Sequence, residues 1–395
     1  MSFWMKMKEK IRSKFILIFL VLVIFWGSFL VLKTLQEKEN VATKSLPFSV
    51  FFLKDGKIWK IDKDVSQPKQ VVFEEKEIRN FDIDPTGKFL AYVAGEKEEQ
   101  FVPEKLILYD LETGKKEPIV ELKGDERFYK IRPLGMKEYE YDVNALKEVF
   151  SFSKTGKKLA FFYNEAINLY DIENRKITPI NIISSDVKPD AFCSIDGAVP
   201  SFWISEDKII LEIVCYEGGI TRILDLNTGV LSDKTLTGAY IGGTIIEGVV
   251  DEERYLAVKS YPDETDELLL KFFDQDLDKK LAEHQTISDA IFHPLSKKVF
   301  YAASEIEECC TENGEQPTFE IYETNLNGEF HKKITDDKKP SLKKTELEIS
   351  KNGDFLLYVE KYLKSGEEKL ALVILNLKTG EKIEIEGASL GKIKE

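Results

Sequence analysis

The stretches 84-DPTGKFLAYVA-94 and 106-LILYDLETGKKEPI-119 decide the fold of this chain. The first is a tight turn followed by apolar and aromatic residues, which is typical of a turn that leads into a buried β-strand. The second contains Asp, Thr and Gly between two apolar runs, which favours a hairpin turn between two strands. With one further strand ahead of residue 84, the two stretches predict a sheet of four strands.

The same unit recurs along the chain, and self-similarity at about 40–50 residues indicates a propeller or a solenoid. The first half of the unit recurs at 153–163, 205–215, 251–261, 293–303 and 350–360, and the second half at 167–180, 222–233, 268–283, 319–334 and 372–385. A partial unit at 49–73 has three strands, and the tail 388–395 is predicted to supply the missing one. Pairing the two chain ends would close the ring and remove its exposed edges.

These units resemble the TolB-type, WD40-like repeat, roughly F-S-P-D-G-K-x-L-A-Y followed by I-Y-x-x-D-L-x-T-G. Residues 84–92 with 106–115, and 152–161 with 167–176, match best, and the resemblance covers about 50–390. It implies an all-β, seven-bladed propeller, with six or eight blades as alternatives. It implies no function, because similar propellers serve as scaffolds, receptors and enzyme accessory domains. The following side chains are predicted to pack between blades: Phe89, Ala91, Tyr92, Leu159 and Phe161.

Ahead of the repeats, residues 15–32 form an uncharged run, FILIFLVLVIFWGSFLVL. As a helix it would span about 27 Å, close to the hydrocarbon core of a bilayer. Five basic residues precede it, which favours a cytoplasmic N-terminus and a body outside the cell membrane. The alternative is a cleaved secretory signal, although no small-residue cleavage site follows the run. The predicted division is a cytoplasmic segment 1–14, a transmembrane signal-anchor helix 15–33, a linker 34–47 and an extracytoplasmic propeller 48–395.

Charge separates this anchor from the body of the chain. The first 14 residues carry +4 while the whole chain carries −14, so the rest carries −18. A strongly acidic body repels nucleic-acid phosphate, and we expect no nucleic-acid partner. We find no G-x-S-x-G elbow, and no Walker or Rossmann glycine signature. Asp274, Asp276 and Asp278 have calcium-loop spacing, but Lys279 stands where the loop needs glycine. The sequence therefore predicts no metal and no cofactor.

Blade topology separates short turns from long connections, and long loops on a rigid scaffold usually carry binding. The long segments 94–104, 123–148, 184–200, 260–267 and 304–317 are all predicted on one face, called here the long-loop face. The other face carries the short turns. It is predicted to point toward the membrane, because the first strand begins there about 15 residues after the anchor. The candidate interaction surface consists of Phe128, Tyr129, Arg132, Met136, Tyr139, Tyr141, Asp263, Asp266, Glu305 and Glu308.

The four cysteines also fall on the long-loop face. Cys193 and Cys215 belong to one blade and are predicted either to pair outside the cytoplasm or to stay as buried thiols. For the adjacent Cys309 and Cys310 three alternatives stay open: a vicinal disulfide between them, disulfides with other cysteines, or free thiols.

Three functions are consistent with these features. The favoured one is a non-catalytic, membrane-tethered binding or scaffold module of the cell envelope, with a protein or glycan partner on the long-loop face. The second is a hydrolase or lyase that uses carboxylates in the propeller funnel, which paired carboxylates of raised pKa would favour. The third is an extracytoplasmic sensor that acts through a membrane partner.

Overall fold

The computed structural model describes residues 46–62, 67–97, 101–122, 129–131, 139–141, 146–164, 166–184, 198–215, 218–239, 243–260, 265–306, 317–337 and 340–395. The chain divides into two compact units, Met1–Pro47 with Asp62–Pro68, and Phe48–Ile61 with Lys69–Glu395. The predicted anchor 15–33 lies outside the described residues. Among the residues that are described, no helix is long and apolar enough to cross a bilayer.

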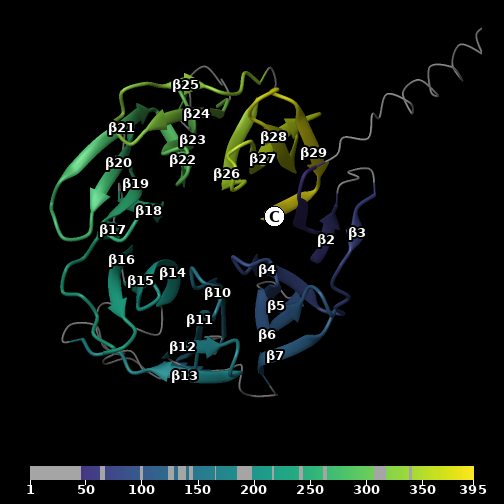
Figure 1. Cartoon of the computed structure of the whole chain (residues 1–395), viewed down its shortest axis with the longest axis vertical. Helices are drawn as coiled ribbons and strands as arrows, with labels where there is room; N and C mark the ends of the chain where they lie inside the picture. The colour runs from purple at the N-terminus through teal and green to yellow at the C-terminus, as the bar shows by residue number, and fades with distance from the viewer. Residues whose placement is uncertain are drawn as a thin grey trace, which may run out of the picture. The chain divides into compact units, whose positions relative to one another are not determined.

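The larger unit is a seven-bladed β-propeller, as the repeats predict. Each blade is a four-stranded antiparallel sheet whose strands are named A to D from the inside outward. Figure 1 shows the seven blades side by side in a ring, with their A strands innermost.

In strand order A to D, three blades come first along the ring. These are blade 1, β30 (Ala388–Lys394), β1 (Ser49–Lys54), β2 (Lys57–Ile61), β3 (Lys69–Gln70); blade 2, β4 (Glu77–Ile83), β5 (Phe89–Lys97), β6 (Phe101–Asp110), β7 (Lys116–Glu121); and blade 3, β10 (Leu146–Phe152), β11 (Lys158–Tyr163), β12 (Ala166–Asp171), β13 (Lys176–Ile180).

Four blades complete the ring. These are blade 4, β14 (Val199–Ser205), β15 (Lys208–Cys215), β16 (Gly218–Asp225), β17 (Thr237–Ala239); blade 5, β18 (Thr244–Val249), β19 (Arg254–Lys259), β20 (Asp266–Phe272), β21 (Asp278–His284); blade 6, β22 (Thr286–His293), β23 (Lys298–Ser304), β24 (Glu320–Asn325), β25 (Lys332–Lys333); and blade 7, β26 (Ser341–Ile349), β27 (Phe355–Lys364), β28 (Glu367–Asn376), β29 (Lys382–Glu386).

The two ends of the propeller unit close the ring. β30 pairs antiparallel with β1, with Ser49 opposite Lys394 and Phe51 opposite Lys392. Blade 1 therefore takes its A strand from the C-terminus and its other three strands from the start of the unit. This confirms the predicted closure by 388–395.

The repeat motif has a local physical cause at the A–B turns. Asp84 directly follows β4, and its Oδ2 accepts a hydrogen bond from Thr86 N at 3.0 Å. Ser350 directly follows β26 and accepts from Phe355 N at 3.0 Å through its Oγ. Gly353 in the same turn has a φ of 73°, and a Cβ there would lie 2.7 Å from the His293 ring of blade 6. The small turn residue thus lets neighbouring A–B turns pack together.

Apolar side chains from neighbouring blades fill the space between them. Ala91 of blade 2 and Leu159 and Phe161 of blade 3 belong to one buried cluster, with Phe89 packed against it. Tyr92 lies in the cluster between blades 1 and 2. All five residues predicted to pack between blades do so.

Two predicted details are wrong. Much of 94–104 is hairpin rather than loop, because β5 runs to Lys97 and β6 starts at Phe101, with a bulge at Ala94 and Gly95. In blade 4 the D strand is β17, Thr237–Ala239, and not the end of 222–233. After its turn the chain there makes isolated bridges, Leu231 with Leu224 and Val230 with Ile183, and no strand. The real D strand then starts where Thr237 N donates to Thr221 Oγ1 at 3.0 Å.

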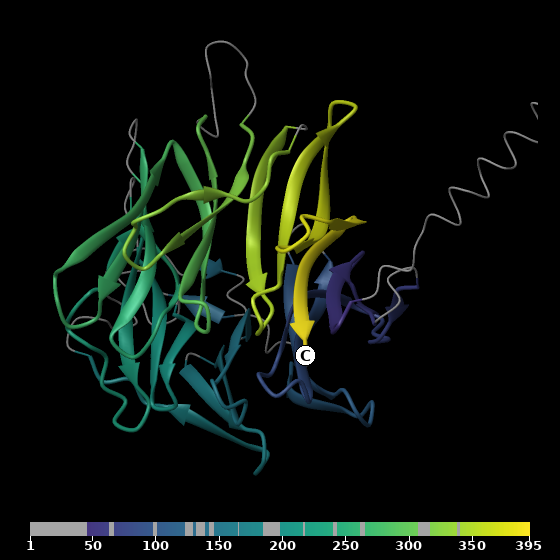
Figure 2. The ribbon, with the colours of Figure 1, turned by 45° about the horizontal axis from the view of Figure 1, so that its top comes forward.

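The remaining long segments connect strands as predicted. The connections after β7 and β13 are D–A connections, and those after β19 and β23 are B–C connections, so the strand ends that they join lie on the long-loop face. The connection after β7 includes a small hairpin of β8 (Tyr129–Ile131) and β9 (Tyr139–Tyr141). Figure 2 shows the blade strands running between the two faces.

Candidate functional site

Few of the predicted site residues fall within the described part of the chain. Outside it lie Cys193, Cys309, Cys310, Phe128, Arg132, Met136, Asp263 and Glu308. Tyr129, Tyr139 and Tyr141 belong to the β8–β9 hairpin, in which Tyr129 is paired with Tyr141. Cys215 ends β15 and is disulfide-bonded. The partner sulfur lies outside the described residues, so the pairing with Cys193 stays a prediction.

The two described acidic candidates have different roles. Asp266 is buried at the start of β20, where its Oδ2 accepts a hydrogen bond from Ile287 N at 2.8 Å. It therefore joins blade 5 to blade 6 and does not form part of an exposed rim. Glu305 follows β23 with its side chain exposed, and its Oε1 lies 2.8 Å from His284 Nδ1. This contact leads to a pocket.

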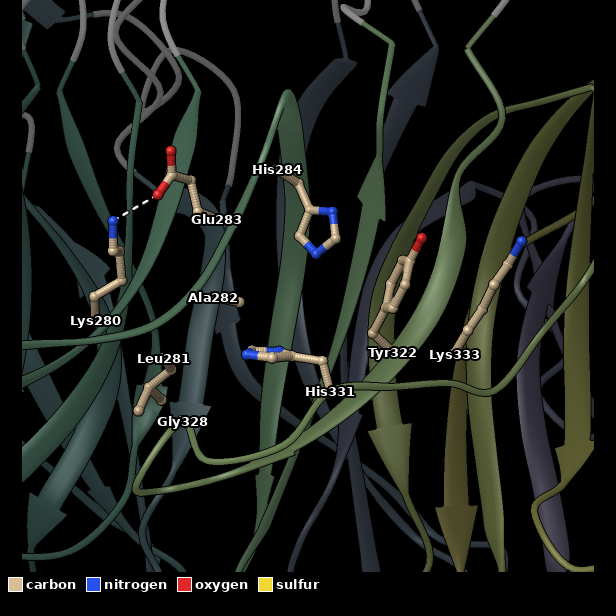
Figure 3. Close-up of a pocket in the computed structure, with 9 residues that line it drawn as sticks. All are labelled: Lys280, Leu281, Ala282, Glu283, His284, Tyr322, Gly328, His331 and Lys333. Carbon is tan, nitrogen blue, oxygen red and sulfur yellow. Dashed lines mark hydrogen bonds and ion pairs between the residues drawn. The ribbon is translucent and has the colours of Figure 1, made fainter.

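The pocket lies between blades 5 and 6 and has a volume of about 570 Å³. We call it the His–Tyr pocket. Its lining consists of Lys280, Leu281, Ala282, Glu283, His284, Tyr322, Gly328, His331 and Lys333. Figure 3 shows the His284 ring above the His331 ring, with Tyr322 beside them.

Unequal outer strands explain why this space stays open. The D strand of blade 5, β21, has seven residues, whereas β25 of blade 6 has two. β25 pairs only with Tyr322 and Glu323 of β24. The outer side of blade 6 is therefore incompletely covered beside a full-length neighbour.

A chain of hydrogen bonds forms one side of the pocket. Glu305 Oε1 contacts His284 Nδ1 at 2.8 Å. His284 Nε2 lies 3.3 Å from the buried Tyr301 hydroxyl, which lies 3.1 Å from His331 Nδ1. A carboxylate only accepts, so His284 donates to it through Nδ1–H, and its Nε2 accepts the Tyr301 proton when the ring is neutral. His331 then donates through Nδ1–H, which leaves its Nε2 as an acceptor.

Aromatic rings hold this chain in place. Tyr301 and Tyr322 stack with centroids 5.4 Å apart, and His284 lies 4.7 Å from Tyr322. Ring pairs of this kind stabilise by about 0.5–1.5 kcal/mol beyond the area they bury. The stacked rings fix the orientation of His284 and of the Tyr301 hydroxyl.

Burial keeps two members of this hydrogen-bonded chain, Tyr301 and His331, uncharged near neutral pH. Burial, followed by the nearby His284, lowers the pKa of His331 below its ordinary range. Burial raises the pKa of Tyr301, followed by the neighbouring Tyr322 and the negative charge of Glu305. Tyr301 therefore stays a hydroxyl, and His331 stays neutral until the solution becomes more acidic.

The charges around the pocket sum to a negative value. Its two lysines are each bound by two carboxylates: Lys280 by Glu267 at 3.2 Å and Glu283 at 2.5 Å, and Lys333 by Glu320 at 3.2 Å and Asp336 at 3.1 Å. With Glu305, five carboxylates face two ammonium groups. The pocket therefore repels polyanions and suits an uncharged or cationic ligand.

A second cluster of ionisable groups follows the A strands around the inside of the ring. The carboxyl groups of Glu247 of β18 and Asp289 of β22 act directly on each other. Farther round, Lys392 Nζ lies 3.4 Å from Glu348 Oε2 and 3.6 Å from Asp82 Oδ1. In the described residues no group of three or more His, Cys, Asp or Glu side chains is arranged to hold a metal ion.

Linear spacing of the sequence does not reveal the His–Tyr pocket, because its residues come from two repeat units. His284 ends the D strand of one unit, whereas His331 lies between the C and D strands of the next. Superposing consecutive units in the sequence would have placed both histidines on facing outer edges. Glu247 and Asp289 have a simpler signal, because each is the single acidic residue of its A strand.

Comparisons with known proteins support the fold. No model of a known protein family matches the sequence, and no curated protein matches it. Among solved structures, the chain is similar to an oligogalacturonate lyase in complex with manganese, at 12% identity with a TM-score of 0.54 over 87% of this chain and 85% of that one. It is also similar to an oligogalacturonate lyase from Vibrio parahaemolyticus, at 14% identity and a TM-score of 0.53 over 85% and 84%.

TolB from Acinetobacter baumannii is 14% identical with a TM-score of 0.47, and the match covers 88% of this chain but 65% of TolB. The chain thus spans less than two thirds of the length of TolB. At such identities the likenesses show a fold and no activity. The fold is a seven-bladed β-propeller.

Proposed function

We propose that this chain is a non-catalytic binding module of the cell envelope, held at the membrane by residues 15–33. The observation that supports binding is the His–Tyr pocket, which combines stacked aromatic rings with fixed donors and acceptors. Sites that orient a small ligand are usually concave, with a few convergent polar groups on a mostly apolar lining.

The ligand class follows from the charge of the pocket. A polyanion is disfavoured, because four carboxylates bind the two lysines of the pocket and a fifth, that of Glu305, binds His284. A neutral polyhydroxylated ligand suits it better, since hydroxyl groups can donate to His331 Nε2 while a sugar ring stacks on Tyr322. We therefore propose an uncharged glycan as the ligand.

A glycan array probed with the full-length chain in detergent tests this proposal. We expect retention of neutral glycans and at least a tenfold loss of affinity in Tyr322→Leu, measured by calorimetry, because the stacking face is lost. Tyr362→Leu, at a half-buried tyrosine of blade 7, is the matched control and should bind normally. Retention of acidic glycans alone, or equal losses in both variants, would contradict the proposal.

A second candidate, a carboxylate-dependent hydrolase or lyase, is favoured by the carboxyl pair Glu247–Asp289 in the channel. The oligogalacturonate of the similar lyases is itself a polyanion, and the channel carboxyls would repel it as the pocket does. This second function would be favoured if the chain turned over a glycan retained on the array. The turnover should then be abolished in Glu247→Gln and kept in Tyr322→Leu. The sensor hypothesis has no specific observation in its support.

A further inference from the structure

The carboxyl groups of Glu247 and Asp289 lie together on the inside of the ring. Glu247 lies on β18 and Asp289 on β22, the contacting A strands of blades 5 and 6, and their carboxyl groups act directly on each other. An ionised carboxylate can only accept hydrogen bonds. A hydrogen bond between the two carboxyl groups therefore requires a proton on one of them.

The groups around the pair favour that proton. The charged neighbours that act on it are acidic, Glu212 on β15 and Glu346 on β26. Lys392 interacts with Asp82, Glu348 and Glu346. The acidic neighbours of the pair add negative charge between blades 5 and 6, which a proton on one member of the pair offsets.

Backbone contacts extend the pair to a third blade. Leu347 N of β26 donates to Asp289 Oδ2 at 3.0 Å, and Ala290 N donates to Glu247. A bulge between Thr345 and Glu348, where Glu346 has a φ of 57°, presents the Leu347 N–H group to blade 6. These bonds satisfy amide groups on the open inner edges of the A strands.

We propose that Glu247 and Asp289 share one proton that fastens the inner ends of blades 5 and 6, and that losing this proton loosens their junction. The same two blades carry the His–Tyr pocket, through β21 and β24. The proton therefore makes the junction that positions the pocket sensitive to pH. The inference does not depend on which ligand the pocket binds.

The direction of the pH effect follows from the pKa shifts. Burial raises the pKa of Asp289 to about 6. Burial and then the charge of Asp289 raise the pKa of Glu247 well above its ordinary range. Both exceed the unfolded values of about 4. A raised folded pKa stabilises the fold below the unfolded pKa, and this stabilisation is lost as the pH rises through the folded pKa. The junction should therefore be firm at pH 4 and weaken from about pH 6 upward.

Thermal unfolding of the full-length chain at a series of pH values tests the shared proton. In Glu247→Gln the amide donates to Asp289 without a titrating proton, so its melting temperature should fall less than that of the wild type between pH 5 and pH 8. Asp289→Asn is a second variant with the same expectation, since its amide donates to Glu247. Glu367→Gln removes an exposed carboxylate of blade 7 and should keep the wild-type slope.

Infrared difference spectroscopy gives a direct readout of the proton. We expect a carboxylic-acid C=O band in the wild type at pH 6 that is absent from Glu247→Gln and Asp289→Asn and present in Glu367→Gln. A wild type without this band, or melting curves of equal pH slope in wild type and both variants, would overturn the proposal.

Discussion

In two segments of the inner ring, called here the proton arc and the lysine arc, carboxyl groups accept backbone amide N–H groups of neighbouring A strands. The two arcs differ in what compensates the negative charge of these carboxyl groups. In the proton arc, Glu247 and Asp289 join blades 5 and 6 and accept amide N–H groups of neighbouring A strands. In the lysine arc, Glu348 accepts from Ile393 N at 2.6 Å, and Lys392 lies between Glu348 and Asp82. Both arcs place carboxylates against open strand edges. In the lysine arc the carboxylates are paired with a cation, Lys392.

Because a shared proton and the charge of a lysine are lost at different pH values, the two arcs should weaken at different pH values. Burial raises the pKa of Glu348 despite the opposing charge of Lys392, so burial outweighs attraction at this carboxyl. For Lys392 the attraction of Asp82 and Glu348 outweighs burial, and its pKa is raised. By the same linkage the contribution of Lys392 is present below its unfolded pKa and is lost only in strongly alkaline solution. The proton arc should fail many pH units earlier.

The largest expected effect comes from removing the closing strand of the lysine arc. A chain that ends at Glu386 lacks β30, which leaves β1 with one unpaired edge and removes Lys392. We expect a loss of more than about 5 kcal/mol of unfolding free energy, a sizeable part of the stability of a typical domain. Denaturant unfolding of the full-length and shortened chains measures it, and equal midpoints would contradict the role of β30.

Removing the cation alone should have the next largest effect. Lys392→Met leaves Glu348 and Asp82 without their shared cation and should lower the unfolding free energy by about 1–3 kcal/mol at pH 7. The deficit should shrink at pH 4, where the carboxylates take up protons. Lys361→Met, at a more exposed lysine paired with Glu368, is the control and should change stability by less than about 1 kcal/mol.

Converting the proton arc into a lysine arc sharpens the comparison. Glu247→Lys places a cation beside Asp289 and Glu212, so the shared proton is no longer needed. We expect the fall in melting temperature between pH 5 and pH 8 to be reduced, with an effect on unfolding free energy of about 1 kcal/mol at pH 8. An unchanged pH slope in circular-dichroism melts would contradict this.

The smallest effect concerns local opening of the two arcs. Raising the pH from 5 to 8 should increase amide exchange in 286–293 several-fold, after correction for the intrinsic rate. Exchange in 388–394 should stay the same, since Lys392 remains charged. Hydrogen-exchange mass spectrometry measures both peptides in one sample, and parallel changes would remove the distinction between the arcs.

The repeat pattern predicted the blades and the closing strand because each unit is stabilised by local turns and by packing against its neighbours. Asp84 and Gly353 illustrate this, since turn capping and a positive φ leave a clear mark on local sequence. The site was not predicted, because His284 and His331 meet only when two units stack. Glu305 was predicted as a surface acid, but its contact with His284 depends on the same stacking.

Closure by β30 also has a consequence for the timing of synthesis. β1 is complete at Lys54, but its inner partner starts at Ala388. At about 5–20 residues per second, the ribosome needs roughly 20–70 s to reach that partner. During this interval one edge of β1 has no partner within the chain, and such an edge can pair with other chains. The ring can close only after residues 388–394 have been synthesised, so the nascent chain depends longest on chaperone protection at its first blade.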